Sequence, residues 1–223
     1  MKTMQIAIDG PAAAGKSTVA KIVAEQLGII YIDTGAMYRA ATLKALETGV
    51  DLSDSQALSD LLTRTDIRLE PGDTGQRVFL DGTDVTEEIR SDKVTRAVSE
   101  VAAHRGVRSR MVKLQKEFAE GRGVVMDGRD IGIHVLKEAD LKVFMIASAE
   151  ERARRRYEEN QIRGIGTPIT DLQAEIEKRD KMDSERKESP LVQAADAVLI
   201  DTTALTVPEV AERIVRLAKE RAD

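Results

Sequence analysis

The sequence predicts an α/β fold in which a five-stranded parallel sheet carries helices on both faces. Short, β-rich apolar runs alternate with segments of helical periodicity along most of the 223 residues. Strands separated by helices in this way are typical of parallel sheets that are buried on both faces. One stretch, residues 66–85, breaks the alternation with hairpin signals and predicts a small antiparallel insert.

The strands and helices of the main sheet follow in chain order. The predicted strands are residues 4–9, 29–33, 123–127, 141–146 and 197–201. The predicted helices are residues 15–27, 36–48, 149–160 and 208–221. Because crossovers between parallel strands are right-handed, the loop after the first strand is expected at the carboxyl edge of the sheet, where ligands bind.

Capping residues mark the ends of these helices. Gly28 and Gly49 are predicted to end the first two, because glycine readily adopts the left-handed conformation that follows a helix. Ser148 and Glu151 form a capping-box pattern before the third, and Thr206 precedes the proline that opens the last.

The insert reads as two hairpins in succession. Asp-Gly between β-type runs is a strong hairpin signal, and a helical stretch follows at residues 86–119. The predicted strands are residues 66–70, 76–80 and 83–85, joined by turns at 71–75 and at Asp81-Gly82.

Composition limits the classes of function. The net charge of −5 argues against a general nucleic-acid binder, and aromatic residues at 3% argue against a stacking platform for single strands. Cysteine is absent, which excludes disulfides and thiolate metal sites and favours a reducing compartment. No run approaches the roughly 18 apolar residues of a membrane span. Because residues 1–4 lead directly into the first strand, no signal peptide is expected, and a cytoplasmic location is predicted.

A phosphate-binding motif follows the first strand. It has the form G-x-x-x-x-G-K-[ST], in which backbone N–H groups and a helix N-terminus surround a phosphate. Lys16 would reach the β- and γ-phosphates, and the hydroxyl of Ser17 is suited to Mg²⁺. The sequence therefore predicts binding of a nucleoside triphosphate. The residues of the motif are Gly10, Pro11, Ala12, Ala13, Ala14, Gly15, Lys16, Ser17 and Thr18.

Polar residues follow two further strands. Thr34 and Arg39 come after the second strand, and their predicted role is to bind an anion. The alternatives are a helix cap for Thr34 and a surface charge for Arg39. Asp127 ends an apolar strand in the manner of a carboxylate that holds Mg²⁺, and Gly128 permits a turn that presents Arg129 and Asp130. The alternative is an ordinary Asp-Gly turn.

Arginines are concentrated after the fourth strand. Residues 152 and 154–156 are all arginine on one predicted helix, and Arg179 and Arg186 are assigned to the next. Neighbouring glutamates can neutralise part of this charge, so some of these arginines are expected at the surface. Phosphoryl transfer nevertheless depends on cations around the moving group and on exclusion of water, and a hinged Arg-bearing lid supplies both.

Taken together, these motifs resemble the bacterial cytidylate kinase family of P-loop nucleoside monophosphate kinases. The likeness extends over essentially the whole chain. Its most specific parts are the Asp-Thr-Gly-Ala-Met-Tyr-Arg string at 33–39 and the Asp-Gly-Arg-Asp-Ile-Gly string at 127–132. The loop departs from the family pattern in its run of alanines and at Ser17. The resemblance implies transfer of the γ-phosphoryl group of Mg·ATP to CMP or dCMP in pyrimidine nucleotide metabolism.

The resemblance also implies roles for individual residues. Lys16, Arg129, Arg155 and Arg156 would be catalytic, and residues 10–18 would bind ATP. Ser17 and Asp127 would hold Mg²⁺. The residues implied for CMP are Thr34, Arg39, Ser99, Arg108, Arg129, Asp130, Arg179, Asp183 and Arg186.

Specificity for cytosine has a chemical basis. The base offers acceptors at O2 and N3 and a donor at N4, which match donors on Arg108 and Ser99 and an acceptor on Asp130. Uracil reverses two of these groups, and an unpaired buried polar group costs about 1–3 kcal/mol, so UMP is expected to be a poor substrate.

The resemblance implies one domain over residues 1–223. Within it, residues 1–62 and 104–223 are expected to form the core, residues 63–103 a nucleotide-monophosphate insert and residues 151–168 the lid. ATP and CMP or dCMP are the expected partners of a monomer that binds neither nucleic acid nor membrane. Two alternatives stay open: a kinase for another small acceptor such as AMP, and a P-loop switch or ATP-binding regulatory module.

Overall fold

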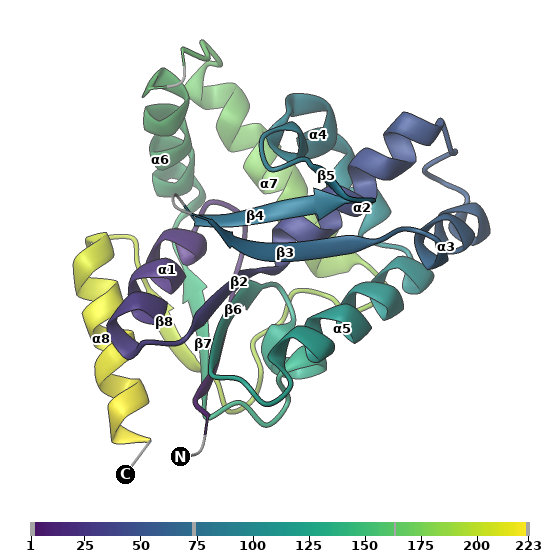
Figure 1. Cartoon of the computed structure of the whole chain (residues 1–223). Coiled ribbons are helices and arrows are strands. Elements are labelled where there is room, and N and C mark those ends of the chain that lie inside the picture. The colour runs from purple at the N-terminus through teal and green to yellow at the C-terminus, as the bar shows by residue number, and fades with distance from the viewer. Residues whose placement is uncertain (1–2, 73–74, 163, 222–223) are drawn as a thin grey trace. The chain divides into compact units, whose positions relative to one another are not determined.

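The computed structural model describes residues 3–72, 75–162 and 164–221. The chain forms two compact units, one of Met1–Ile30 with Arg122–Asp223 and the other of Tyr31–Gly121 (Figure 1). The main sheet has five strands in the order β2-β6-β1-β7-β8. The chain passes from the first unit into the second within β2 (Ile30–Asp33).

The elements of the first unit confirm the predicted α/β alternation. β1 pairs in parallel with β6 and β7, and β7 pairs in parallel with β8. Its elements in chain order are β1 (Gln5–Asp9), α1 (Lys16–Leu27), β6 (Val124–Gly128), the π-helical turn η2 (Ile131–Val135), β7 (Leu141–Ile146), α6 (Ala149–Ile162), α7 (Ile169–Glu185), β8 (Val198–Asp201) and α8 (Val207–Glu220).

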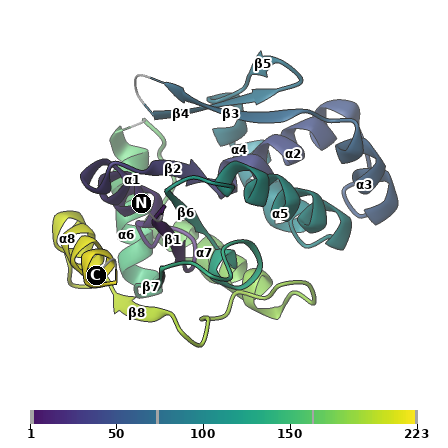
Figure 2. The same cartoon turned by 60° about the horizontal axis from the view of Figure 1, so that its bottom comes forward.

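Helices enclose the central strands of this sheet. Ile6 and Ile8 of β1 and Met145 of β7 are completely buried, which explains the uninterrupted apolar character of these segments. α8 packs against α1, as both views show (Figures 1 and 2). α6 packs against α7 in the same unit. Among the described residues, none of the helices has the length and apolar composition that a membrane span requires.

The predicted caps are present, except that the capping box at Ser148 is only half formed. Gly28 and Gly49 adopt left-handed conformations at φ 64° and 69° and end α1 and α2. The amide of Glu151 donates to the Ser148 hydroxyl at 3.1 Å, while the Glu151 side chain binds arginines of its own helix. Thr206 forms a full capping box at the start of α8.

The second unit contains the predicted antiparallel insert. β3 (Ile67–Gly72), β4 (Gly75–Leu80) and β5 (Thr83–Asp84) form a three-stranded sheet in that order. Residues 73–74 of the predicted first turn lie outside the described residues. α2 packs on β3 and β4 (Figure 2). The helices of this unit are α2 (Thr34–Thr48), α3 (Ser55–Thr63), the 3₁₀ turn η1 (Glu88–Arg90), α4 (Asp92–Val101) and α5 (Arg105–Ala119).

Two helices differ from the prediction. α2 begins at Thr34 rather than at residue 36, because the Asp33 carboxylate accepts the amide of Ala36 at 2.9 Å and caps the helix. Thr34 is therefore not the cap. α3 was not predicted, although Asp54 caps it and Leu58 and Leu62 recur at helical spacing on its buried side.

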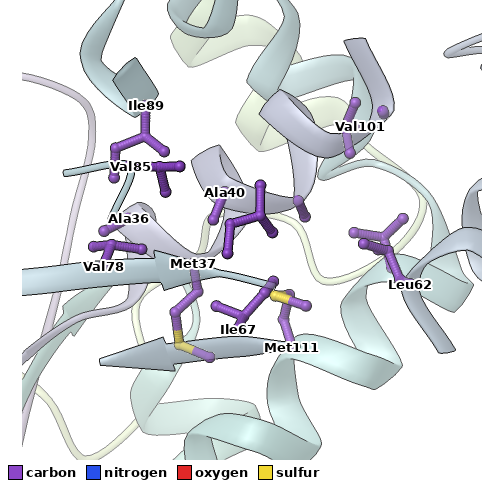
Figure 3. Packing of buried hydrophobic residues seen from close by; sticks show 14 of the residues in the cluster. Ala36, Met37, Ala40, Leu62, Ile67, Val78, Val85, Ile89, Val101 and Met111 are labelled. Carbon is purple, nitrogen blue, oxygen red and sulfur yellow. The ribbon is translucent and has the colours of Figure 1, made fainter. Parts of the chain in front are cut away.

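An apolar cluster packs the helices and strands of the second unit together. Met37 of α2 and Met111 of α5 are completely buried in it, beside Ile67 of β3 and Val78 of β4 (Figure 3). Methionine suits this junction of helices and strands because its unbranched side chain fills irregular gaps.

Candidate functional site

The loop between β1 and α1 adopts the conformation that its glycines permit. Gly10 has φ 150°, and a Cβ there would lie 2.1 Å from the carbonyl oxygen of Met145, so no other residue fits without movement of the backbone. Gly15 has φ 85° immediately before α1. Ala13 has φ 58°, a left-handed conformation that is uncommon for a residue with a side chain. These residues bring the loop close to β7 and leave its backbone at the N-terminus of a helix, where anions bind.

Lys16 is buried at the centre of this loop. Its side chain is folded back, and Nζ donates to the carbonyl oxygen of Pro11 at 2.6 Å. Burial, followed by the positive charge of Arg129, lowers the pKa of Lys16 to about 7, against the opposing effect of Asp127. A phosphate near Nζ would favour the ammonium form, so the group is suited to binding an anion.

Ser17 and Asp127 lie side by side. The Ser17 hydroxyl donates to Oδ2 of Asp127 at 2.8 Å. Asp127 is buried on β6, the strand next to β1. The two oxygens come from the strand end and the helix start that the sequence singled out. Among the described residues, no group of three or more His, Cys, Asp or Glu side chains could hold a metal by itself.

Asp9 is a site residue that the sequence analysis did not single out. It ends β1 and is buried, and its two oxygens accept the amides of Ile131 and Gly132 at 2.8 Å each. Burial raises the pKa of Asp9 to about 6, although these two hydrogen bonds act in the opposite direction. Asp9 ends an apolar strand just as Asp127 does, and that shared pattern was the available signal.

Several arginines of the first unit surround the carboxylate of Asp183. Nε of Arg129 donates to Asp183 at 2.9 Å, and a nitrogen of Arg186 lies 3.7 Å from its other oxygen. Burial opposes ionisation of Asp183, but the charges of Arg129 and Arg179 outweigh it and hold the pKa below its ordinary value. Arg186 follows α7 as its C-terminal cap rather than lying on the helix as predicted, and its Nε donates to the carbonyl of Ser189 at 2.7 Å.

The arginines of α6 have different environments. Arg154 is exposed and pairs with Glu151 and Glu158, and Arg156 pairs with Glu159 at 3.2 Å. Arg155 donates to Glu151 and to the carbonyl of Thr202 at 2.6 Å. A nitrogen of Arg155 lies 3.8 Å from where a Cβ on Gly15 would be.

Arg152 is the buried member of this set. It donates to the carbonyl of Ala12 at 3.2 Å and pairs with Asp180 of α7 at 2.6 Å. Arg152 was predicted only as one of the arginines of the lid, and Asp180 was given no role, because periodicity alone does not distinguish a buried arginine from its exposed neighbours.

The second unit carries four of the predicted nucleotide-binding residues. Thr34 is buried at the start of α2, and Arg39 of the same helix donates to the hydroxyl of Thr95 at 2.8 Å. Arg108 of α5 is buried, donates to the carbonyl of Ala102 at 3.2 Å and lies over the ring of Tyr38. Ser99 is half-buried on α4.

The loop and the sheet order define the class of P-loop kinase folds. A solved structure of shikimate kinase from Acinetobacter baumannii has a TM-score of 0.50 and 17% identity, and the match covers 98% of this chain and 94% of that one. An uncharacterized protein from Eubacterium ventriosum gives a TM-score of 0.54 at 13% identity, over 98% and 99% of the two chains. At these identities the likeness concerns the fold alone.

Sequence comparison then gives the particular family. The family model described as cytidylate kinase matches residues 6–220. The cytidylate kinase of Bacillus subtilis (strain 168) is 57% identical over 221 residues, which are 99% of each chain. That of Bacillus pumilus is 60% identical, over 97% of this chain and 96% of its own. The chain belongs to the cytidylate kinase family.

Proposed function

We propose that this protein transfers the γ-phosphoryl group of Mg·ATP to CMP or dCMP, giving CDP or dCDP and ADP. The observation that carries the proposal is the family match across residues 6–220, together with identities of 57% and 60% to cytidylate kinases over nearly their full length. The P-loop, with its buried lysine, is consistent with the donor half of this reaction.

The loop Gly10–Thr18 is proposed to bind the phosphates of ATP. Lys16 would release the carbonyl of Pro11 and turn to the β- and γ-phosphates, and its charge would stabilise the charge that develops on the moving phosphoryl group. Arg155 and Arg156 are proposed to assist from α6. The proximity of Arg155 to Gly15 supports this role, although both arginines would first leave their present partners.

Mg²⁺ fits the oxygens of Ser17 and Asp127. A hydroxyl and a carboxylate hydrogen-bonded at 2.8 Å are hard donors of the kind this ion prefers. Mg²⁺ keeps several waters and phosphate oxygens in such sites, so two protein ligands are sufficient. When bound, the ion would neutralise charge on the β- and γ-phosphates.

The acceptor nucleotide is proposed to be held by basic and acidic side chains. Arg39 and Arg129 would hold its phosphate, and Arg179 and Asp183 would hold the ribose. Since these last two can share contacts to the 3′-hydroxyl, dCMP remains usable. No general base is required, because the attacking phosphate is already ionised. The remaining proposed contacts are Thr34, Ser99, Arg108, Asp130 and Arg186.

We further propose that the protein is a cytoplasmic monomer that acts on small molecules and binds neither nucleic acid nor membrane. The absence of cysteine supports a reducing compartment, and the net charge of −5 supports the proposal that nucleic acid is not bound. Residues 63–103 are proposed as the nucleotide-monophosphate insert and residues 151–168 as the lid. The proposed core comprises residues 1–62 and 104–223.

A coupled assay of ADP release tests the proposed function. With Mg·ATP as donor, we expect turnover of CMP and dCMP, and kcat/KM for UMP lower by about 10- to 100-fold because uracil leaves buried polar groups unpaired. AMP outperforming CMP would show a different acceptor. ATP binding with no nucleotide-dependent turnover would favour a P-loop regulatory module instead.

A further inference from the structure

Arg152 connects three segments of the first unit through one side chain. Its Nε donates to the carbonyl of Ala147 just after β7 at 2.9 Å. One terminal nitrogen donates to the carbonyl of Ala12 in the P-loop at 3.2 Å and to Asp180 Oδ1 at 3.1 Å, and the other donates to Asp180 Oδ2 at 2.6 Å. Only 6% of the side chain is exposed. Four of its five N–H donors are therefore used, and the three partner residues, Ala147, Ala12 and Asp180, lie on three different segments.

The chemistry of arginine is required at this position. A planar guanidinium can bind a carboxylate with two parallel bonds and still donate to carbonyls at its edge. A lysine ammonium is a compact charge on a flexible stem and cannot span the same three partners. Removal of Asp180 would leave a buried cation without its counter-ion, so the pair acts as a unit.

An apolar contact also joins the P-loop to α6 and α7. Ala153, Leu172 and Ile176 form a small buried cluster between α6 and α7, and Ala13 of the P-loop packs against it. The P-loop therefore meets the α6–α7 hairpin through side chains at Ala13 and through the backbone carbonyl at Ala12. A shift of the loop tip has to be accommodated by the hairpin.

α7 continues from this contact to the proposed acceptor residues. Asp180 lies between Arg179 and Asp183 on one turn of α7, and Asp183 binds Arg129 at 2.9 Å. An unbroken series of contacts therefore runs from the P-loop backbone through Arg152 and Asp180 to the residues proposed for the acceptor.

We propose that Arg152 and Asp180 are positioning residues that couple the binding of the two nucleotides. ATP on the loop would fix the carbonyl of Ala12, hold Arg152 against Asp180 and so set the orientation of α7 for the acceptor. This inference rests on the proposed function, because it assigns ATP to the loop and CMP to α7. Coupling between two sites is reciprocal, so CMP strengthens ATP binding by the same factor.

Calorimetry on the full chain measures this coupling directly. The dissociation constant of CMP is determined alone and with saturating Mg²⁺ and β,γ-imido-ATP, and that of the analogue with and without CMP. We expect the wild-type protein to bind each ligand about tenfold more tightly in the presence of the other. In Asp180→Asn and in Arg152→Lys this ratio should fall to about one, with the affinity for CMP alone changed about threefold or less.

Two matched variants serve as controls. Arg154→Gln removes a neighbouring arginine of α6 that pairs at the surface, and Glu175→Gln removes an exposed carboxylate of α7. Both should keep the wild-type ratio. A role confined to folding would lower the melting temperature and leave the ratio of the folded protein unchanged.

The outcomes separate the inference from the proposed function. A wild-type ratio retained in Asp180→Asn overturns the inference, as does a wild-type protein that phosphorylates CMP without any coupling. Failure of both variants to fold at 25 °C also overturns it, because the pair would then be structural. Failure of the wild-type protein to bind CMP contradicts the proposed function itself. A ratio lost in either variant and kept in the controls supports the inference.

Discussion

The two units of the chain differ in the charged side chains that they bury. The described core of the second unit (Tyr31–Gly121) is a cluster of aliphatic and methionine side chains around Met37 and Met111. Its buried charged side chain is Arg108. In the first unit, the buried charged side chains are Asp9, Lys16, Asp127, Asp130, Lys142, Arg152 and Asp183.

This difference distinguishes residues that take part in the proposed reaction from residues that stabilise the fold. Burial of an ion costs several kcal/mol in real proteins and is offset only by close partners, whereas apolar burial is favourable by itself. Lys142 of β7 pairs with Asp196, and the other charges of this set lie on or near the P-loop and α7, where phosphates would supply or replace partners. Substitutions of buried charged residues around the P-loop and α7 should therefore affect turnover, whereas substitutions in the apolar cluster of the second unit should affect folding.

Lys16→Met tests this comparison with the largest expected effect. Loss of the ammonium should reduce kcat on the order of 10³-fold, since it removes a charge aimed at the moving phosphoryl group. Burial lowers the pKa of Lys16 from 10.5 to about 7, so folding disfavours its charged form. The contribution of Lys16 to stability, measured against Lys16→Met, should therefore be least favourable below pH 7 and become more favourable as the pH rises from about 7 toward 10.5. The free energy of unfolding of Lys16→Met at neutral pH should be no lower than that of the wild type.

Steady-state ADP release and urea unfolding measure the two effects. Lys21→Met, at an exposed position of the same helix, is the control and should change neither. A Lys16→Met protein that retains kcat within about tenfold of the wild type would contradict the proposed role.

Met111→Ala makes the opposite test in the second unit. Met111 is completely buried in the apolar cluster, and its truncation should lower the free energy of unfolding by about 3 kcal/mol through lost contacts and a cavity. At 25 °C the folded protein should keep its kcat. Urea unfolding checks the first expectation and the assay the second, with exposed Lys113→Ala as a control that should change stability by less than about 0.5 kcal/mol. If Lys16→Met and Met111→Ala lost the same amount of stability, the two units would not differ in the way proposed.

Much of this fold could be predicted because its signals are local. Apolar runs, glycine caps and the Asp-Gly turn identified all five strands of the main sheet and the antiparallel insert. α3 was missed because it is short, although Asp54 and the following leucines mark it. The start of α2 was misplaced because Asp33 was not considered as a cap.

The contacts of the site depend on distant segments and could be predicted only in part. The motif spacing identified Lys16, Ser17 and Asp127, whose meeting follows from adjacent parallel strands. Nothing local distinguishes buried Arg152 from exposed Arg154 two residues later, because the difference is made by Asp180 and by the Ala12 carbonyl. Such roles require the tertiary structure.

Asp130→Ala sharpens the comparison at the level of specificity. If its carboxylate accepts the N4 donor of cytosine, kcat/KM for CMP should fall by about 10- to 100-fold while KM for ATP stays nearly unchanged. Arg108→Ala is the matching test in the second unit. It should likewise lower kcat/KM for CMP and leave KM for ATP nearly unchanged. Kinetics with each substrate varied in turn measure it. An equal collapse of ATP affinity would place these residues at the donor nucleotide.

Asp9→Asn gives the smallest expected effect and tests whether a buried charge lowers the stability of the first unit. Burial raises the pKa of Asp9 from 3.8 to about 6, with Asp130 acting in the same direction and Lys16 against it. Between these values the folded protein retains a proton that the unfolded chain has lost. Its contribution to stability is therefore fully present below pH 3.8 and is lost as the pH rises through about 6.

Asparagine does not titrate, so the difference in stability between the two proteins should change with pH. Relative to Asp9→Asn, the wild type should lose about 1 kcal/mol between about pH 5 and pH 7.5. The variant also replaces one acceptor of the Ile131 and Gly132 amides by a donor, but that loss is nearly independent of pH, so the slope isolates the ionisation. Urea unfolding across this range measures the slope, with exposed Asp171→Asn as the control. A wild-type protein that gains stability relative to the variant over this range would show that the hydrogen bonds outweigh burial and that Asp9 is ionised at little cost.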